Sequence, residues 1–348
     1  MWATVRHWTA RARSAPADAR PARRHRCRAE GTLRPGMATR NRNPFDDGGL
    51  WLTDAGAETA LIYHHGVDLP GFATFPLLES ETGRQALREY IDPFLALARE
   101  RGAGFVLGTA TWRANPDWGR ELGYDEPALA AVNRRAVAFA EELRADTPAW
   151  DRPVLIEAVL GPRGDAYAPS SLMTAAEAER YHATQLQTLA DGACDVACAL
   201  TITYADEAIG MVRASGAAGL PISVSFTVET DGRLPSGQTL RSAIEQVDAE
   251  TDGAPLHYMI NCAHPTHFAG ALSDEGPWLE RLRGLRANAS ALSHAELDES
   301  ADLDDGDPAD LGRRHAELRG SLPNVVLLGG CCGTDIRHVT SICDAWLA

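Results

Sequence analysis

Residues 324–335 read NVVLLGGCCGTD, an apolar run that ends in two glycines and two adjacent cysteines. The run has no clean alternation of apolar and polar residues, which is typical of a strand buried on both faces. The segment after it predicts a helix, because apolar side chains recur at helical spacing on one face. These side chains are Ile336, Val339, Ile342, Cys343 and Trp346. A buried strand followed directly by a helix is the repeating unit of a parallel α/β fold.

Seven earlier segments have the same form, a short apolar or β-branched run and then a helical stretch. The eight runs are LWLTDAG from Leu50, GFVLGTAT from Gly104, PVLIEAV from Pro153, DVACALT from Asp195, PISVSFT from Pro221, HYMINCA from His257, GLRANAS from Gly284 and NVVLLGGCC from Asn324. One helix has a clear start signal, a capping box of Thr174 and Glu177. Eight such units predict an α/β fold of the (β/α)8 or TIM barrel type. A doubly wound open sheet is the alternative.

The chain has 348 residues, a length that suits a single α/β barrel. Residues 1–42 differ from the rest, since they hold eleven of the 33 basic residues against only Asp18 and Glu30. We interpret residues 1–42 as an Arg-rich leader that is disordered or precedes the true start, for which Met37 is a candidate. Residues 43–348 are expected to form one barrel domain.

Composition excludes several classes of protein. The net charge is −15, and the acidic excess lies in residues 43–348, so nucleic acid is not an expected partner. No apolar run approaches the roughly 20 residues of a membrane span. The seven cysteines are odd in number and widely spread, with no secretory signal before them, which favours a reduced, cytoplasmic protein.

A barrel carries its active site at the carboxyl ends of its strands. The side chains expected there are Asp54, Thr109, Thr111, Glu157, Leu200, Thr201, Ser225, Asn261, Cys262, Asn288, Cys331 and Cys332. Three cysteines, from the ends of the sixth and eighth strands, therefore meet on one rim. Successive side chains of a strand point to opposite faces, so the paired cysteines need a turn between them, which Gly329, Gly330 and Gly333 are expected to permit.

Three thiolates suit zinc and leave a fourth position for a further soft ligand such as a substrate sulfur. A free thiol has a pKa of about 8.5, and coordination removes its proton, so such a site suits alkyl transfer to sulfur. The alternatives are a redox pair, three thiols that only pack, a zinc hydrolase, or a zinc- or thiol-binding protein without turnover.

Four motifs in this order resemble the zinc-dependent homocysteine S-methyltransferases, a family that includes the betaine and S-methylmethionine enzymes. The first-strand motif corresponds to LTDAGAET from Leu52, and the fifth strand with its loop to VSFTVETDGRLPSGQTLRSAI from Val224. The first zinc cysteine of the family corresponds to NCAHP from Asn261, and the last two to GGCCGT from Gly329. The resemblance runs from about Leu50 to the end of the chain.

The resemblance implies Zn²⁺ bound by Cys262, Cys331 and Cys332, a small-molecule thiol as acceptor and a sulfonium, quaternary ammonium or folate as methyl donor. Homocysteine would be the acceptor and methionine the product, which would place the enzyme in methionine biosynthesis. Asp54 would contact the amino group of the acceptor. The other residues expected to bind substrate are Thr201, Asn261, Asn288 and Trp112.

Three positions, in the segments after the second and fourth strands, depart from the family pattern. Leu200 stands where the family commonly has a glutamate that helps bind the ammonium group of the substrate. Ala110 and Trp112 stand where an asparagine and a tyrosine are usual, and an indole could offer its face to a cationic donor. An acceptor other than homocysteine, another thiol or a selenol, is therefore an alternative.

Overall fold

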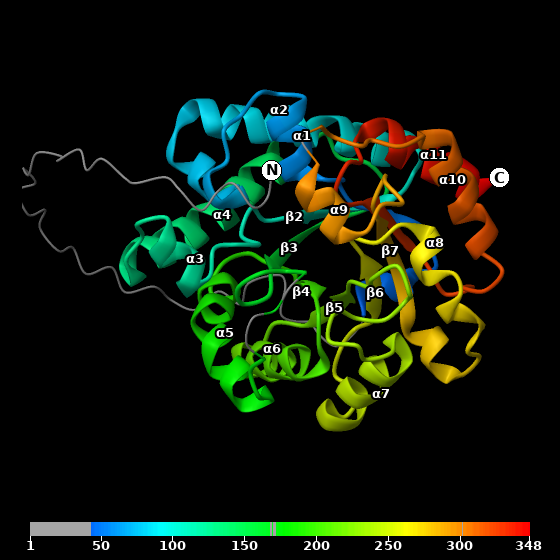
Figure 1. The fold of residues 1–348 in the computed structure, drawn as a ribbon. Helices are drawn as coiled ribbons and strands as arrows, with labels where there is room; N and C mark the ends of the chain where they lie inside the picture. Colours follow the sequence, from blue (N-terminus) through cyan, green and yellow to red (C-terminus); the bar gives the residue numbers. More distant parts are fainter. Residues whose placement is uncertain (1–42, 168, 170–171, 301) are drawn as a thin grey trace, which may run out of the picture.

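A computed structural model describes residues 43–167, 169, 172–300 and 302–348 of the chain. Within this part, eight parallel strands pair in sequence order, and β1 pairs with β8 to close the barrel (Figure 1). The strands are β1 Trp51–Leu52, β2 Gly104–Gly108, β3 Val154–Leu160, β4 Val196–Ile202, β5 Ile222–Phe226, β6 Tyr258–Asn261, β7 Leu282–Ala287 and β8 Leu327–Gly330. The predicted (β/α)8 barrel is thus confirmed, and the open sheet is excluded. The predicted leader, residues 1–42, lies outside the described residues.

One strand begins earlier than its sequence pattern indicated. The run from Gly284 marked the seventh strand, but β7 starts at Leu282. Arg283 interrupts the apolar run and hides this start. Its guanidinium extends to the backbone carbonyl of Phe45, 2.7 Å away, and to the carboxylate of Asp46.

The helices surround the barrel (Figure 1). They are α1 Ala57–Tyr63, α2 Glu81–Glu100, α3 Pro116–Glu121, α4 Glu126–Asp146, α5 Ala175–Ala190, α6 Ala205–Ala218, α7 Leu240–Thr251, α8 Pro265–Phe268, α9 His294–Glu299, α10 Pro308–Leu318 and α11 Ile336–Leu347. Short 3₁₀ segments lie at Pro44–Asp47, Pro70–Phe72, Phe75–Glu79, Ala271–Ser273 and Pro277–Arg281. The predicted capping box of Thr174 and Glu177 opens α5, and α11 buries the apolar face that its spacing indicated. Among the described residues, no helix combines the length and apolarity that crossing a membrane requires.

The barrel interior changes character from one end to the other. Strand side chains alternate between the interior and the layer beneath the helices. An interior apolar cluster includes Trp51 and Phe45, whose rings lie 5.3 Å apart at the amino ends of the strands. Toward the carboxyl ends, interior positions are polar and include Ser225, Asn261 and Arg286, all buried. The aromatic end closes the barrel, and the polar end is left for a site.

Candidate metal centre and substrate pocket

The three predicted cysteines come together at the carboxyl end of the barrel. Cys262 follows β6 directly, and Cys331 and Cys332 follow β8. Their three Sγ atoms all lie within 4.8 Å of one another, and those of Cys262 and Cys332 are 3.4 Å apart. A tetrahedral zinc with Zn–S bonds of about 2.3 Å needs sulfur separations of about 3.8 Å, which lies inside this range. The sulfur atoms therefore fit a zinc ion with only small side-chain adjustments. No other group of three potential metal ligands occurs in the described residues.

The cysteine cluster stabilises a thiolate on its own. Hydrogen bonds from the Cys262 and Cys332 thiols, together with the nearby charge of Arg286, hold the pKa of Cys331 well below its usual value. Burial raises the pKa of Cys262, which therefore keeps its proton and can donate it. A soft nucleophilic or metal-binding sulfur is thus prepared by its neighbours.

The glycines around the paired cysteines play two different roles. Only Gly333 has a positive φ, 77°, and makes the turn. Gly329 and Gly330 belong to β8, where an added Cβ would overlap the hydroxyl oxygens of Thr53 and Thr334. The expectation that all three permit the turn was therefore wrong for two of them. Those two allow close approach of the neighbouring segments.

Asn261 braces the strand ends from behind the pocket. Its Oδ1 accepts hydrogen bonds from the Thr201 backbone N–H at 3.0 Å and from the Ser225 hydroxyl at 2.6 Å. Its Nδ2 donates to Thr201 Oγ1 at 2.8 Å. Thr201 and Cys262 have φ values of 65° and 53°, which are costly for residues with a Cβ. Asn261 is fully buried, so it is placed to hold this strained backbone.

A tyrosine that the sequence reading missed covers the cysteines. The hydroxyl oxygen of Tyr167 lies 2.8 Å from Cys262 Sγ and 3.9 Å from Cys332 Sγ. Its ring packs on His294 of α9, with centroids 4.2 Å apart. His294 in turn contacts Glu229 at 3.0 Å and the Cys262 carbonyl at 2.6 Å. Tyr167 and Glu229 stand in loops and His294 is the first residue of α9, and no local sequence pattern links them, so only the fold could reveal this group.

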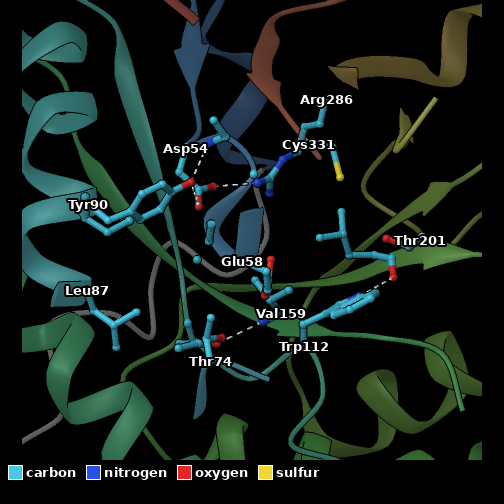
Figure 2. Close-up of a pocket in the computed structure, with 18 of the residues that line it drawn as sticks. Asp54, Glu58, Thr74, Leu87, Tyr90, Trp112, Val159, Thr201, Arg286 and Cys331 are labelled. Carbon is cyan, nitrogen blue, oxygen red and sulfur yellow. Dashed lines mark hydrogen bonds and ion pairs between the residues drawn. The ribbon is translucent and has the colours of Figure 1, made fainter. Parts of the chain in front are cut away.

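A pocket of about 100 Å³ opens beside the cysteines (Figure 2). Its walls come from the turn after β1 with α1, from the segment after β2, from the ends of β4 and β7, and from the cysteines. An apolar extension runs between α2 and α4, lined by Leu87, Ile91, Phe139 and Leu143. The cavity thus joins a polar, sulfur-lined part to an apolar one.

Asp54 lines this pocket, as expected, but it is already paired. Arg286 Nη2 lies 2.6 Å from Asp54 Oδ1, and the Tyr90 hydroxyl donates to Oδ2 at 3.2 Å (Figure 2). Burial raises the pKa of Asp54, while Arg286 and Tyr90 act in the opposite direction. Arg286 was not among the expected site residues. Its signal in the sequence was an arginine inside an apolar strand run, since a buried charge requires a partner.

Glu58 is a second pocket carboxylate that the sequence reading did not select. It stands in the first turn of α1 and points into the pocket (Figure 2). No residue in the described ranges forms an ion pair with it. Burial raises its pKa to about 7, and the charges of Cys331 and Asp54 act in the same direction.

Trp112 and Leu200 form an adjoining wall. Both line the pocket, and the Trp112 indole N–H donates to the Leu200 carbonyl at 3.2 Å. The Arg113 guanidinium lies 5.0 Å from the centroid of the Trp112 ring. This cation already uses part of the indole surface that was expected to face a donor.

Several other expected rim residues lie away from the pocket. Thr109 and Thr201 line it, whereas Asn261, Asn288 and Glu157 do not. Asn288 is buried, and within the described residues its Oδ1 has no hydrogen-bond partner. Glu157 is the fourth residue of β3 instead of its end, and burial raises its pKa to about 7.

The closed barrel brings three cysteine sulfur atoms together at its strand ends, in a group that could hold a metal ion. The family model for homocysteine S-methyltransferase matches residues 51–346, and the chain belongs to this family. This confirms the resemblance and supports an S-methyltransferase activity.

Solved structures agree on the fold. The homocysteine methyltransferase MmuM from Escherichia coli in its oxidized form is 20% identical, with a TM-score of 0.66, and the match covers 86% of this chain and 99% of that one. The metallated form is 19% identical, also with a TM-score of 0.66, and the match covers 88% and 99%.

Proposed function

We propose that this protein transfers a methyl group from a sulfonium or ammonium-type donor to a thiol held on zinc, with homocysteine as acceptor and methionine as product. The convergence of Cys262, Cys331 and Cys332 at the pocket carries this proposal. Family membership supports the reaction class. The thiol sulfur forms a bond to the methyl carbon, the bond from that carbon to the donor breaks with its electron pair, and the thiol proton is released.

The three cysteines would hold the zinc ion, because their sulfur separations suit tetrahedral coordination. Bound there, zinc would supply a lowered pKa and a fixed position for the acceptor sulfur. The thiolate stabilised at Cys331 prepares the site for a cation. A donor that carries a positive charge would also be attracted to this sulfur-rich pocket.

The remaining residues would position substrates and exclude water. Asp54, Thr201 and Trp112 line the pocket and would contact the bound molecules. Asn261 would act through Thr201, whose backbone N–H it holds, and through Cys331, to whose Sγ it donates a hydrogen bond. Asn288, which is buried outside the lining, would support the wall after β7. Tyr167 lies over the sulfur atoms and would limit access of water to them.

A different acceptor, another thiol or a selenol, is the second candidate. Leu200 favours it, because a neutral side chain lines the pocket where the family commonly has a carboxylate. A zinc hydrolase is less well supported, since three thiolates make zinc a weak activator of water. We place the reaction in the cytoplasm, where free thiols persist.

The test is methyl transfer by the zinc-loaded protein to homocysteine, with S-methylmethionine, S-adenosylmethionine and betaine as parallel donors. Methionine formed from at least one donor supports the proposal. Methylation of other thiols or selenols, with homocysteine inert towards every donor, would favour the second candidate. Full activity of the metal-free protein would falsify the zinc-dependent mechanism.

A further inference from the structure

We propose that Glu58 binds the α-ammonium group of the acceptor and thereby selects amino-acid thiols as the substrate class. This assignment rests on the proposed function, since it concerns the same pocket. In this assignment Glu58, and not Asp54 as the resemblance implied, contacts the amino group of the acceptor. Three features of the pocket carry it.

Asp54 has its charge balanced within the protein. The Arg286 guanidinium is 2.6 Å from Asp54 Oδ1, and both side chains are largely buried, Asp54 being 14% and Arg286 7% exposed. The Tyr90 hydroxyl occupies Oδ2. An incoming ammonium would have to compete with a buried guanidinium for this carboxylate. Asp54 and Arg286 together therefore present little net charge to a substrate.

Glu58 is the pocket carboxylate whose charge is not balanced. Within the described residues it has no ion-pair partner, and the cation that influences it most is Arg113. Arg113 donates to the Gly71 carbonyl and lies 3.9 Å from the centroid of the Trp118 ring. A carboxylate in a partly dehydrated pocket is costly without a counter-ion. A substrate ammonium would supply that counter-ion.

The neighbouring wall explains why a carboxylate is needed at this place. Leu200 lines the same pocket at the end of β4 and offers no charge. The first turn of α1 lines the cavity and adjoins the cysteine loop, because its Thr59 hydroxyl accepts a hydrogen bond from the Gly333 N–H at 3.1 Å. An acceptor whose sulfur lies at the cysteines can therefore direct its amino group towards Glu58 (Figure 2).

The test compares equilibrium binding of two thiols to the zinc-loaded protein by calorimetry. The probes are homocysteine and γ-mercaptobutyrate, which has the same chain without the amino group. The wild-type protein is expected to bind homocysteine about tenfold to hundredfold more tightly, as is typical of a charged hydrogen bond. Glu58→Gln should bring this ratio close to one and leave γ-mercaptobutyrate binding unchanged, which also shows that the variant is folded.

Two further variants sharpen the test. Glu58→Asp keeps the charge and should retain part of the discrimination. Glu141→Gln removes an exposed carboxylate from α4 and should change neither affinity. The donor is measured separately, through its KM in the transfer reaction.

The outcomes separate this assignment from the proposed function. An unchanged ratio in Glu58→Gln, in a protein that still methylates homocysteine, overturns the role of Glu58 alone. A raised donor KM with unchanged thiol binding also overturns it and moves Glu58 to the donor. A wild-type protein that binds neither thiol overturns the assignment together with the proposed function.

Discussion

The cysteine wall of the pocket, formed by Cys262, Cys331 and Cys332, was expected in full from the sequence, whereas the carboxylate wall, formed by Asp54, Glu58 and Arg286, was expected only at Asp54. Metal–ligand distances are fixed to within about 0.2 Å, so the ligands must come from strand ends that the barrel holds in place. The attraction between charges falls slowly with distance, so a carboxylate that binds a charged substrate group can be supplied by any of several helices or strands around the pocket. The difference teaches that the positions of the metal ligands in this barrel are more tightly constrained than the positions of the carboxylates that bind charged substrate groups.

The cysteine wall should be the more sensitive of the two. Cys331→Ala is expected to lose the bound zinc and to reduce methyl transfer below detection, because two sulfur atoms cannot complete the site. Metal analysis of the purified protein and product formation measure both effects. Cys194→Ala, which changes a cysteine outside the cluster, should keep about one zinc per chain. Full zinc content in Cys331→Ala would contradict the expectation that the cysteine wall is the more sensitive of the two.

On the carboxylate wall, the buried ion pair should dominate stability. Arg286→Met is expected to lower the free energy of unfolding by about 3–5 kcal/mol, because Asp54 is left as an unpaired buried charge. Urea unfolding measures this loss. The double variant with Asp54→Asn should recover much of it. A single-variant loss below about 1 kcal/mol would mean that the pair is not coupled as its geometry indicates.

Asn261, which lies behind the pocket, is expected to have a smaller effect. Asn261→Ala removes three hydrogen bonds to Thr201 and Ser225 and a longer one, of 3.8 Å, to Cys331 Sγ, and is expected to cost about 1–3 kcal/mol of stability. It should lower the rate of transfer while zinc remains bound, since the cysteines themselves are retained. Asn261→Asp, which keeps the acceptor oxygen, should be less harmful to stability than Asn261→Ala. Loss of zinc in Asn261→Ala would show that the brace serves the metal site directly.

The smallest expected effect is a pH dependence of stability at Glu58, which faces Asp54, Cys331 and Arg113. Its folded pKa of about 7 lies above the ordinary value of 4.5, so the folded state holds a proton that the unfolded state releases. Wild-type stability should therefore fall as the pH rises from about 4.5 to 7. Glu58→Gln has no such proton. Its melting temperature should rise relative to wild type by a few degrees between pH 5 and pH 8. A constant difference across this range would mean that Glu58 is well solvated.

The strand ends were predictable because they follow from local rules. Buried runs gave the positions of eight strands, and alternation then placed Cys262, Cys331 and Asp54 at one end of the barrel. Arg286 was not selected, because its partner Asp54 lies more than 200 residues away along the chain. Glu58 was not selected, because its role depends on the absence of an ion-pair partner in the described part of the chain. Neither fact is visible in a local pattern.

The amino-acid sequence by itself determined the barrel and the meeting of three cysteines, because apolar periodicity fixes the strands and a closed parallel barrel brings the carboxyl ends of all its strands to one rim. The tertiary structure alone decided that Asp54 is neutralised by Arg286, that Tyr167 lies over the sulfur atoms and that Glu58 has no ion-pair partner among the residues that the structure describes. Ion pairing and burial depend on distances of a few ångströms between distant segments. Those distances are set by side-chain packing around the pocket, which no single stretch of sequence contains.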